Sequence, residues 1–267
     1  MQEFSFFYKK GSAGYVRGEQ IANELKGKHN PKEGYMDDIC IYVKHYPTGE
    51  IPKGTYIDVD DAPDVMDWIK KHPKVGVIVN SQTARDFIAE FLGRDDLHVI
   101  PHAHCNWKCE VRPTRPVKKV GIIGSKTSFQ YPIEDFKAKL AKIGLELVYE
   151  PDYWATYGNN RQKVCDFYKG IDIQVVWRPK QFSMFLKNPN KLYNAGSFGI
   201  PTVAYPEFNF VKEWLGYFLP ARNMEEMIMW LEKLKNDPEF YRIRAEQALL
   251  RAGSTEIENI LDLYEQL

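Results

Sequence analysis

Short apolar runs alternate with amphipathic segments along the whole chain. In the first half, runs suited to buried strands stand at residues 4–8, 39–43, 54–59, 75–79 and 97–100. Helical spacing of apolar residues predicts helices at 18–25, 64–71 and 83–92, and Ser81 stands where its hydroxyl caps the last of these. Strands that alternate with helices in this way are typical of an α/β fold built on a parallel sheet.

The same alternation starts again after a stretch rich in proline and basic residues. Residues 110–118, EVRPTRPVK, have little apolar content and predict a linker. Beyond it, we expect strands at 120–124, 145–149, 171–177 and 202–204, and helices at 133–143, 161–169, 189–198, 224–236 and from 238 to the end. We therefore expect two α/β domains, residues 1–112 and 117–250, and a C-terminal helix, residues 251–267, that packs back on the first domain.

Ligands of open parallel sheets bind outside the carboxyl ends of the strands. Two such domains that face each other would form a cleft, and the residues that follow each strand are the first candidates for a site. The longest candidate stretch is 187–205, KNPNKLYNAGSFGIPTVAY.

This stretch predicts a helix that begins near Pro189 and leads into a buried strand. Lys191 lies in the first turn, where a lysine and the helix N-terminus together favour phosphate, and Asn194 follows one turn later, where it can bond a ribose hydroxyl. The small residues from Ala195 onward allow close approach of a ligand. The alternative is a helix packed on a sheet through small residues, with a solvated lysine.

Two further candidates follow strands of the second half. Arg178 ends the strand at 171–177, and its guanidinium suits bidentate binding of a diphosphate. Gly124 and Ser125 end the strand at 120–124, where their backbone amides can hold phosphate. The alternatives are a surface arginine beside a proline and an ordinary capped turn.

A glycine-bearing loop follows the first strand. Gly11, Ser12, Gly14 and Arg17 lie in it, and the glycines permit close backbone approach to a ligand. The loop is neither a Walker motif nor a GxGxxG motif. A plain turn is the alternative interpretation.

Two groups of possible metal ligands lie close together in the sequence, one of histidines and cysteines and one of aspartates. His102, His104, Cys105 and Cys109 are all zinc-ligand types, but no paired Cys-x-x-Cys is present, and the adjacent His104 and Cys105 are hard to aim at one ion. We therefore expect no metal here; the histidines are either partners of a sugar hydroxyl or phosphate, or structural.

The aspartate cluster follows the strand at 54–59. Asp58, Asp60 and Asp61 stand there as candidates for a metal site or a base, and a polar loop that caps a helix is the alternative.

Composition narrows the class of protein. The 36 basic residues balance 36 acidic ones, which argues against a nonspecific nucleic-acid binder. We expect no signal peptide and no membrane span, because no long apolar run is present. Four cysteines in 267 residues do not suggest a disulfide framework, so we expect reduced thiols and a cytoplasmic location.

Three of these segments together resemble the GT-B class of glycosyltransferases. Residues 194–204, NAGSFGIPTVA, are similar to the donor-nucleotide motif of that class, with Asn194 in the position of an acidic residue. Many retaining members carry a second glutamate eight positions earlier, where this chain has Leu186. Residues 75–106 resemble the end of the N-terminal domain of the class, and the loop at 9–18 stands where the class has a glycine-rich loop.

The resemblance implies two Rossmann-like domains facing a cleft and a C-terminal helix that crosses back. It implies transfer of a hexosyl unit from a nucleoside diphosphate sugar, UDP-linked, to a hydroxyl of a glycan, lipid, protein or modified DNA base, with a retaining outcome favoured and no cofactor or metal. The residues that this assigns to the donor are Gly124, Ser125, Arg178, Lys191, Asn194 and Ala195. His102 and His104 are then the catalytic candidates, and the loop with Gly11, Ser12, Gly14 and Arg17 contacts the acceptor or the phosphates.

Three alternatives stay open at this point. One is a glycosyltransferase that acts on a hydroxymethylated DNA base, which net neutrality disfavours. The others are a sugar-nucleotide epimerase and a noncatalytic nucleotide-sugar-binding protein, the last kept open by the missing glutamate at position 186. The oligomeric state is open as well.

Overall fold

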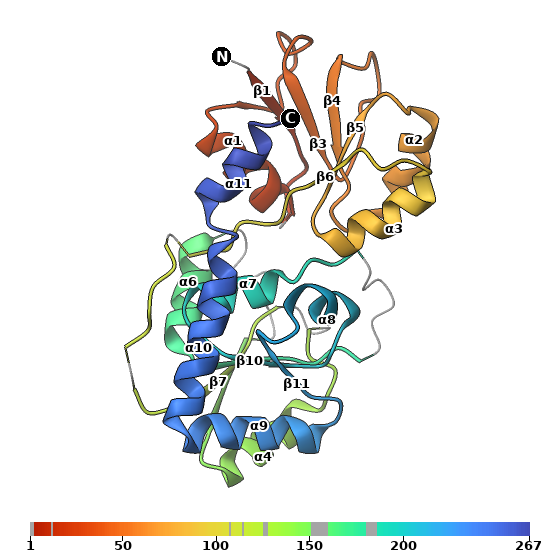
Figure 1. Ribbon diagram of the computed structural model, residues 1–267. Helices are drawn as coiled ribbons and strands as arrows, with labels where there is room; N and C mark the ends of the chain where they lie inside the picture. Colours follow the sequence, from red (N-terminus) through yellow and green to blue (C-terminus); the bar gives the residue numbers. More distant parts are fainter. Residues whose placement is uncertain are drawn as a thin grey trace. The chain divides into compact units, whose positions relative to one another are not determined.

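The chain forms two compact units, each built around one parallel sheet (Figure 1). The structure is a computed structural model and describes residues 3–11, 13–106, 108–113, 115–124, 128–150, 160–179 and 186–267. Unit 1 comprises the described residues of 1–103, 183–188 and 257–267, and unit 2 those of 104–182 and 189–256.

The division between the units falls earlier than the proline-rich stretch. The first crossing lies between residues 103 and 104, so the described residues of 104–118 belong to unit 2. The sequence predicts this boundary at 112 and does not predict that residues 186–188 belong to unit 1. The last strand of the first sheet ends at Val99 and the first strand of the second begins at Lys119, so among the described residues no sheet runs across the division.

The sheet of unit 1 has the strand order β2-β1-β3-β4-β5-β6, with all neighbours parallel. Its strands are β1 (Phe4–Phe7), β2 (Lys28–His29), β3 (Ile39–Val43), β4 (Gly54–Asp58), β5 (Gly76–Val79) and β6 (Leu97–Val99). Its helical segments are η1 (Gly14–Glu19), α1 (Gln20–Glu24), η2 (Pro63–Val65), α2 (Met66–Lys71), α3 (Gln82–Leu92) and α11 (Ile257–Tyr264).

Both faces of this sheet are covered, which explains the continuous apolar runs of its strands. Along β3, Ile39 and Ile41 face α1 and α11, whereas Cys40 and Tyr42 face α2 and α3. Tyr264 of α11 is fully buried there, with its ring edge against Phe6 of β1. The alternation follows from the two-residue period of a strand.

The sheet of unit 2 has the order β11-β10-β9-β7-β8, again all parallel. Its strands are β7 (Lys119–Ile122), β8 (Glu146–Tyr149), β9 (Ile173–Val176), β10 (Thr202–Ala204) and β11 (Leu219–Pro220). Its helices are α4 (Ile133–Lys142), α6 (Arg161–Gly170), α7 (Asn190–Ser197), α8 (Phe208–Trp214), α9 (Met224–Asn236) and α10 (Pro238–Gly253).

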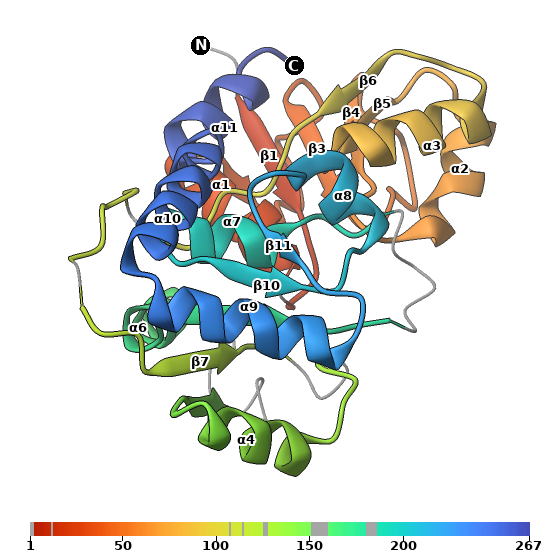
Figure 2. The same ribbon diagram turned by 60° about the horizontal axis from the view of Figure 1, so that its bottom comes forward.

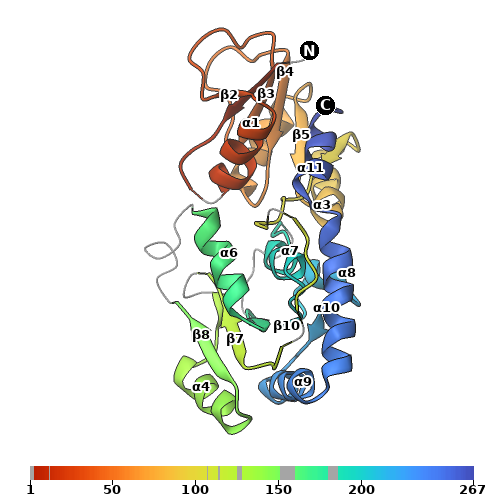
Figure 3. The same ribbon diagram turned by 90° about the vertical axis from the view of Figure 1, so that its left-hand side faces the viewer.

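Helices also cover both faces of this second sheet. Helices α4 and α9 pack on one face, where Phe136, Leu140 and Leu231 lie in one apolar cluster with strand residues (Figure 2). Helices α6 and α7 pack on the other face, and α10 lies beside α7 (Figure 3). Unit 2 is therefore a three-layer arrangement with its own core.

Helix ends explain where the sequence expectation held and where it failed. Ser81 caps α3 as expected, because its hydroxyl accepts from the Ala84 amide at 3.1 Å. The helix expected from 238 to the end is instead two helices, α10 and α11. At the break, the hydroxyls of Ser254 and Thr255 donate to carbonyls three residues back, and such bonds compete with helix continuation.

Three short elements were not expected from the apolar pattern: α8, β2 and β11. The first helical segment begins at Gly14 with a wider, π-type turn rather than at Gly18. None of the helices described is both long enough and apolar enough to cross a membrane. All four cysteines lie in the described part of the chain, and each is a free thiol.

Candidate functional site

The sheet of unit 2 has a switch point, where the connections between its strands change direction. The chain runs from β7 outward to β8 and then returns to place β9 on the other side of β7. Connections therefore leave the sheet in opposite directions between β7 and β9, and ligands of open α/β sheets bind at the carboxyl end of such a switch point. Gly124 follows β7 there, and Arg178 follows β9.

Lys191 of α7 reaches the turn after β7. Its ammonium donates to the carbonyl of Ile123, and a Cβ placed on Gly124 would collide with that ammonium and with the hydroxyl of Ser128. Gly124 also has a φ of +125°, which glycine adopts without strain. A lysine, a glycine turn and the start of a helix thus meet at the switch point, and the N-terminus of a helix favours an anion. Ser125 lies outside the described residues.

Arg178 is held in a buried, bidentate ion pair with Glu207. Its Nε donates to Oε1 at 2.6 Å and its Nη2 to Oε2 at 2.5 Å, and the two residues are 7% and 2% exposed. The carboxylate occupies the fork of the guanidinium and matches its charge. Contact of Arg178 with a diphosphate stays a prediction, and in this structure the side chain joins the ends of β9 and β10.

Residues later in α7 make packing and hydrogen-bond contacts within unit 2. The Oδ1 of Asn194 accepts from the Cys105 amide at 2.8 Å, and Ala195 is fully buried, so its methyl group offers no surface to a nucleotide. A Cβ on Gly196 would lie 2.6 Å from the Ala248 carbonyl oxygen of α10. The small residues let α10 approach α7, which is the packing interpretation of this part of the stretch (Figure 3).

Unit 1 contains a buried polar cluster at the carboxyl ends of β4, β5 and β6. The Oδ1 of Asp60 lies 2.8 Å from His102 Nε2 and accepts from Asn80 Nδ2 at 3.0 Å. Asn188 adds a contact, with its Nδ2 2.7 Å from His102 Nε2. Within the described part of the chain, neither His102 Nδ1 nor Asn80 Oδ1 has a hydrogen-bond partner, although both atoms are buried. Because buried polar atoms are usually hydrogen-bonded, these two atoms mark this edge of the sheet as a candidate ligand site.

The Asp60 carboxylate is held in an uncommon setting. Its φ of +46° is rare for a residue other than glycine and is tolerated mainly by aspartate and asparagine. Burial raises the pKa of Asp60, but the charge and hydrogen bond of His102, together with Arg17 and Asn80, outweigh burial and hold the pKa well below its usual range. Asp60 therefore stays ionised at neutral pH and fixes the ring of His102.

Arg17 lies beside this cluster and is itself 1% exposed. Its Nε donates to Asp58 Oδ2 at 2.5 Å and its Nη1 to the Ile100 carbonyl at 2.9 Å. Burial raises the pKa of Asp58, and the Arg17 guanidinium opposes that rise. Arg17 thereby ties η1 to the ends of β4 and β6, and its expected contact with acceptor or phosphate stays a prediction.

The glycine loop after β1 is largely part of the same packing. A Cβ on Gly14 would collide with the Lys9 carbonyl, and one on Gly18 would collide with the ring of Tyr8. Gly11 has a φ of +151° and open space where a Cβ would stand. Ser12 lies outside the described residues, so Gly11 is the part of the predicted loop that the structure leaves accessible.

His104, the second histidine of the pair, belongs to unit 2 rather than unit 1. Its Nε2 lies 3.4 Å from the Sγ of Cys109, and its amide donates to the Thr255 carbonyl. Burial and the neighbouring Glu256 raise the pKa of Cys109 to about 12. The structure therefore places His104 with Cys109 and Glu256, and places His102 with Asp60 and Asn188.

The fold of this chain has counterparts among solved structures. No family model matches, and no curated protein matches the sequence. Among solved structures, the GtfA/B complex superposes with a TM-score of 0.55 at 11% identity, over 93% of this chain and 54% of that one. A mutant of S. aureus TarM, in complex with UDP among other ligands, gives 0.54 at 15% identity, over 88% and 52%.

Sucrose-phosphate synthase from Thermosynechococcus elongatus gives a TM-score of 0.54 at 13% identity, over 98% of this chain and 73% of that one. The chain has the GT-B fold. It spans about half the length of the first GT-B structures that it matches. At these identities the likeness establishes the fold alone.

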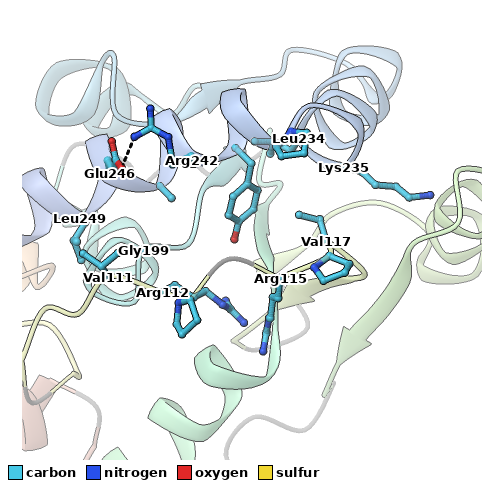
Figure 4. Close-up of a pocket in the computed structure, with 15 residues that line it drawn as sticks. Val111, Arg112, Arg115, Val117, Gly199, Leu234, Lys235, Arg242, Glu246 and Leu249 are labelled. Carbon is cyan, nitrogen blue, oxygen red and sulfur yellow. Dashed lines mark hydrogen bonds and ion pairs between the residues drawn. The ribbon is translucent and has the colours of Figure 1, made fainter.

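Unit 2 has a pocket that lies away from the switch point of its sheet. It has a volume of about 190 Å³ and is lined by residues that precede β7 and β10, such as Val117 and Gly199, and by Leu234 of α9 (Figure 4). These are the amino ends of the strands, opposite the edge where α/β sheets bind ligands. Its Arg115 is already paired with Asp172 at 2.6 Å.

The sequence did not predict three of the residues that these contacts involve: Asn80 and Asn188 in the polar cluster of unit 1, and Glu256 beside His104 and Cys109. Asn80 directly follows β5, so its place at the carboxyl end of a strand was a usable signal. Asn188 was not foreseen because no apolar pattern marks the return of residues 186–188 to unit 1. Glu256 stands about 150 residues after His104 in the sequence, and only the fold brings them together.

Proposed function

We propose that this chain is a glycosyltransferase that moves a hexosyl unit from a nucleoside diphosphate sugar, UDP-linked, to an acceptor hydroxyl. The observation that carries the proposal is the position of Lys191, whose ammonium stands against Gly124 at the switch point of the unit 2 sheet. The GT-B fold supports it, and solved structures with that fold contain UDP: TarM of S. aureus and the pneumococcal O-GlcNAc transferase GtfA.

Unit 2 contributes the donor site in this proposal. The first amides of α7 and the ammonium of Lys191 bind the diphosphate, and the turn at Gly124 gives the phosphates room. Negative charge grows on the diphosphate as the bond to the sugar breaks, so these groups bind the departing group more strongly than the intact donor. Asn194 bonds the ribose through its amide nitrogen, while its Oδ1 stays on the Cys105 amide.

Unit 1 contributes the acceptor side. His102 presents its buried Nδ1, and the ionised Asp60 fixes the ring through Nε2 at 2.8 Å. A histidine oriented by a carboxylate is suited to bond a sugar hydroxyl or to accept a proton from it. The role of catalytic residue therefore goes to His102, whereas the neighbours of His104 point to a different role.

A thermal-shift screen against UDP, GDP and their sugars tests the donor class, because a ligand of the folded state raises Tm by mass action. Product analysis with the stabilising sugar nucleotide then separates the alternatives. A transferase releases the nucleoside diphosphate, an epimerase gives a second sugar nucleotide, and a noncatalytic binder gives neither. Stabilisation by no nucleotide in the panel would count against the proposal.

A further inference from the structure

Three metal-ligand side chains converge in unit 2, outside the donor site. A ring nitrogen of His104, the Sγ of Cys109 and a carboxylate oxygen of Glu256 all lie within 4.8 Å of one another. His104 is 1% exposed, and the other two residues are partly buried. Neither the nucleotide site nor the polar cluster of unit 1 uses any of the three.

Their spacing suits a tetrahedral ion. Bond lengths of about 2.0–2.3 Å at a tetrahedral angle place neighbouring ligand atoms about 3.3–3.6 Å apart. The observed distance from His104 Nε2 to Cys109 Sγ is 3.4 Å. These two atoms therefore already stand at the separation that zinc requires, and a carboxylate oxygen of Glu256 lies within 4.8 Å of both ligand atoms.

The backbone holds these residues in place. The His104 amide donates to the Thr255 carbonyl at 3.1 Å, and the Cys109 amide donates to Glu256 Oε1 at 3.2 Å. His104 and Cys109 are thereby fastened to the turn after α10, where the Thr255 hydroxyl donates to the Ala252 carbonyl. A site whose ligands sit on two segments joined by backbone hydrogen bonds is preorganised.

We propose that His104, Cys109 and Glu256 form a zinc site, with water as the fourth ligand. One imidazole, one thiolate and one carboxylate suit zinc, whereas magnesium and calcium prefer oxygen ligands alone. On binding, the Cys109 thiol gives its proton to solvent and the sulfur bonds the ion.

The position of the site indicates its use. His104 is the first residue of unit 2 and Glu256 the last, so the ion would bind both segments where the chain enters and finally leaves this unit. It would thus cross-link residues about 150 positions apart, and such a cross-link stabilises the folded unit. The sequence marked His104 and Cys109 as zinc-ligand types but gave no reason to favour a metal, because it grouped them with His102 and Cys105 and did not include Glu256.

The test measures zinc on the full chain, stripped with a chelator, dialysed against dilute zinc sulfate and then against metal-free buffer. We expect one zinc per chain by elemental analysis, and a rise in Tm of about 5 °C at one hundred times Kd. Cobalt(II) should give the near-ultraviolet thiolate-to-metal band that a cysteine ligand produces. Less than half an equivalent of zinc, with no cobalt band, would overturn the proposal.

Matched variants separate the site from other thiols and carboxylates. Cys109→Ser and Glu256→Gln remove ligands, and we expect Cys109→Ser to weaken zinc binding by more than about a hundredfold. The controls are Cys40→Ser, a buried thiol of unit 1, and Glu258→Gln, an exposed carboxylate two residues on. Equal zinc content in Cys109→Ser and Cys40→Ser would also overturn it. If Cys109→Ser does not fold, Glu256→Gln and the cobalt band decide.

Discussion

Replacement of Lys191 by alanine tests the donor site at one atom. The ammonium of Lys191 donates to the Ile123 carbonyl and stands beside Gly124, where a nucleoside diphosphate would place its phosphates in our proposal. The substitution removes a full positive charge and leaves the first amides of α7 in place. It therefore isolates the charge-assisted contact from the helix.

The size of the effect follows from the kind of contact. A hydrogen bond to a charged group contributes about 1.5–3 kcal/mol, so the Kd for UDP should rise by about tenfold to about a hundredfold. The same change leaves the Ile123 carbonyl without its lysine donor, which should lower the free energy of unfolding by about 0.5–1.5 kcal/mol. That cost is small enough for the variant to fold, which circular dichroism and a urea transition would verify.

Calorimetric titration of UDP into the parent and Lys191→Ala measures the ratio of the two Kd values. Lys169→Ala serves as the matched control, because Lys169 is an exposed lysine at the end of α6 in the same unit. We expect the control to bind as the parent does. Unchanged affinity in Lys191→Ala, for a nucleotide that the parent binds, would refute the reasoning and leave Lys191 as a structural donor to Ile123.

Two further predictions concern stability. The pKa of Asp60 is depressed in the folded state, so its carboxylate stabilises the fold above the unfolded pKa of about 3.9 and this contribution is lost as the pH falls further. The difference in unfolding free energy between the parent and Asp60→Asn should therefore shrink between about pH 5 and pH 2, and a constant difference in urea titrations would contradict this. Gly196→Val should cost about 1–3 kcal/mol, because its Cβ meets the Ala248 carbonyl oxygen at 2.6 Å. Gly170→Ala is the control, because a Cβ on Gly170 meets no atom within 4 Å. Equal urea midpoints for the two variants would show that α7 and α10 are not packed as described.

Much of the fold could be predicted from apolar patterning. Buried parallel strands form continuous apolar runs, and those at 39–43 and 202–204 were located to the residue. Caps carried local signals as well, as at Ser81. The patterns failed where an element is too short to show a period, as in β2, and where hydroxyl side chains divide one apolar helix pattern into two helices at 254–256.

The candidate sites were predictable only in part, because a sequence orders residues along the chain and not in space. Gly124 was a candidate because it follows a strand, and Lys191 because it lies in the first turn of a helix; the structure places the two side by side. The ion pair of Arg178 with Glu207 could not be foreseen, since the two residues lie 29 positions apart in the sequence. The same holds for His102, whose partner Asp60 lies 42 residues earlier.

The proposal that the chain is a glycosyltransferase is tested most directly by release of nucleoside diphosphate. The parent, His102→Gln and Lys191→Ala are each incubated with the sugar nucleotide that stabilises the parent, with and without simple sugar acceptors, and the products are separated by chromatography. Our account predicts release by the parent, with the hexosyl unit found on water or on an acceptor, and at least about tenfold slower release by both variants. No release from any sugar nucleotide that binds, or equal release by all three proteins, would contradict it.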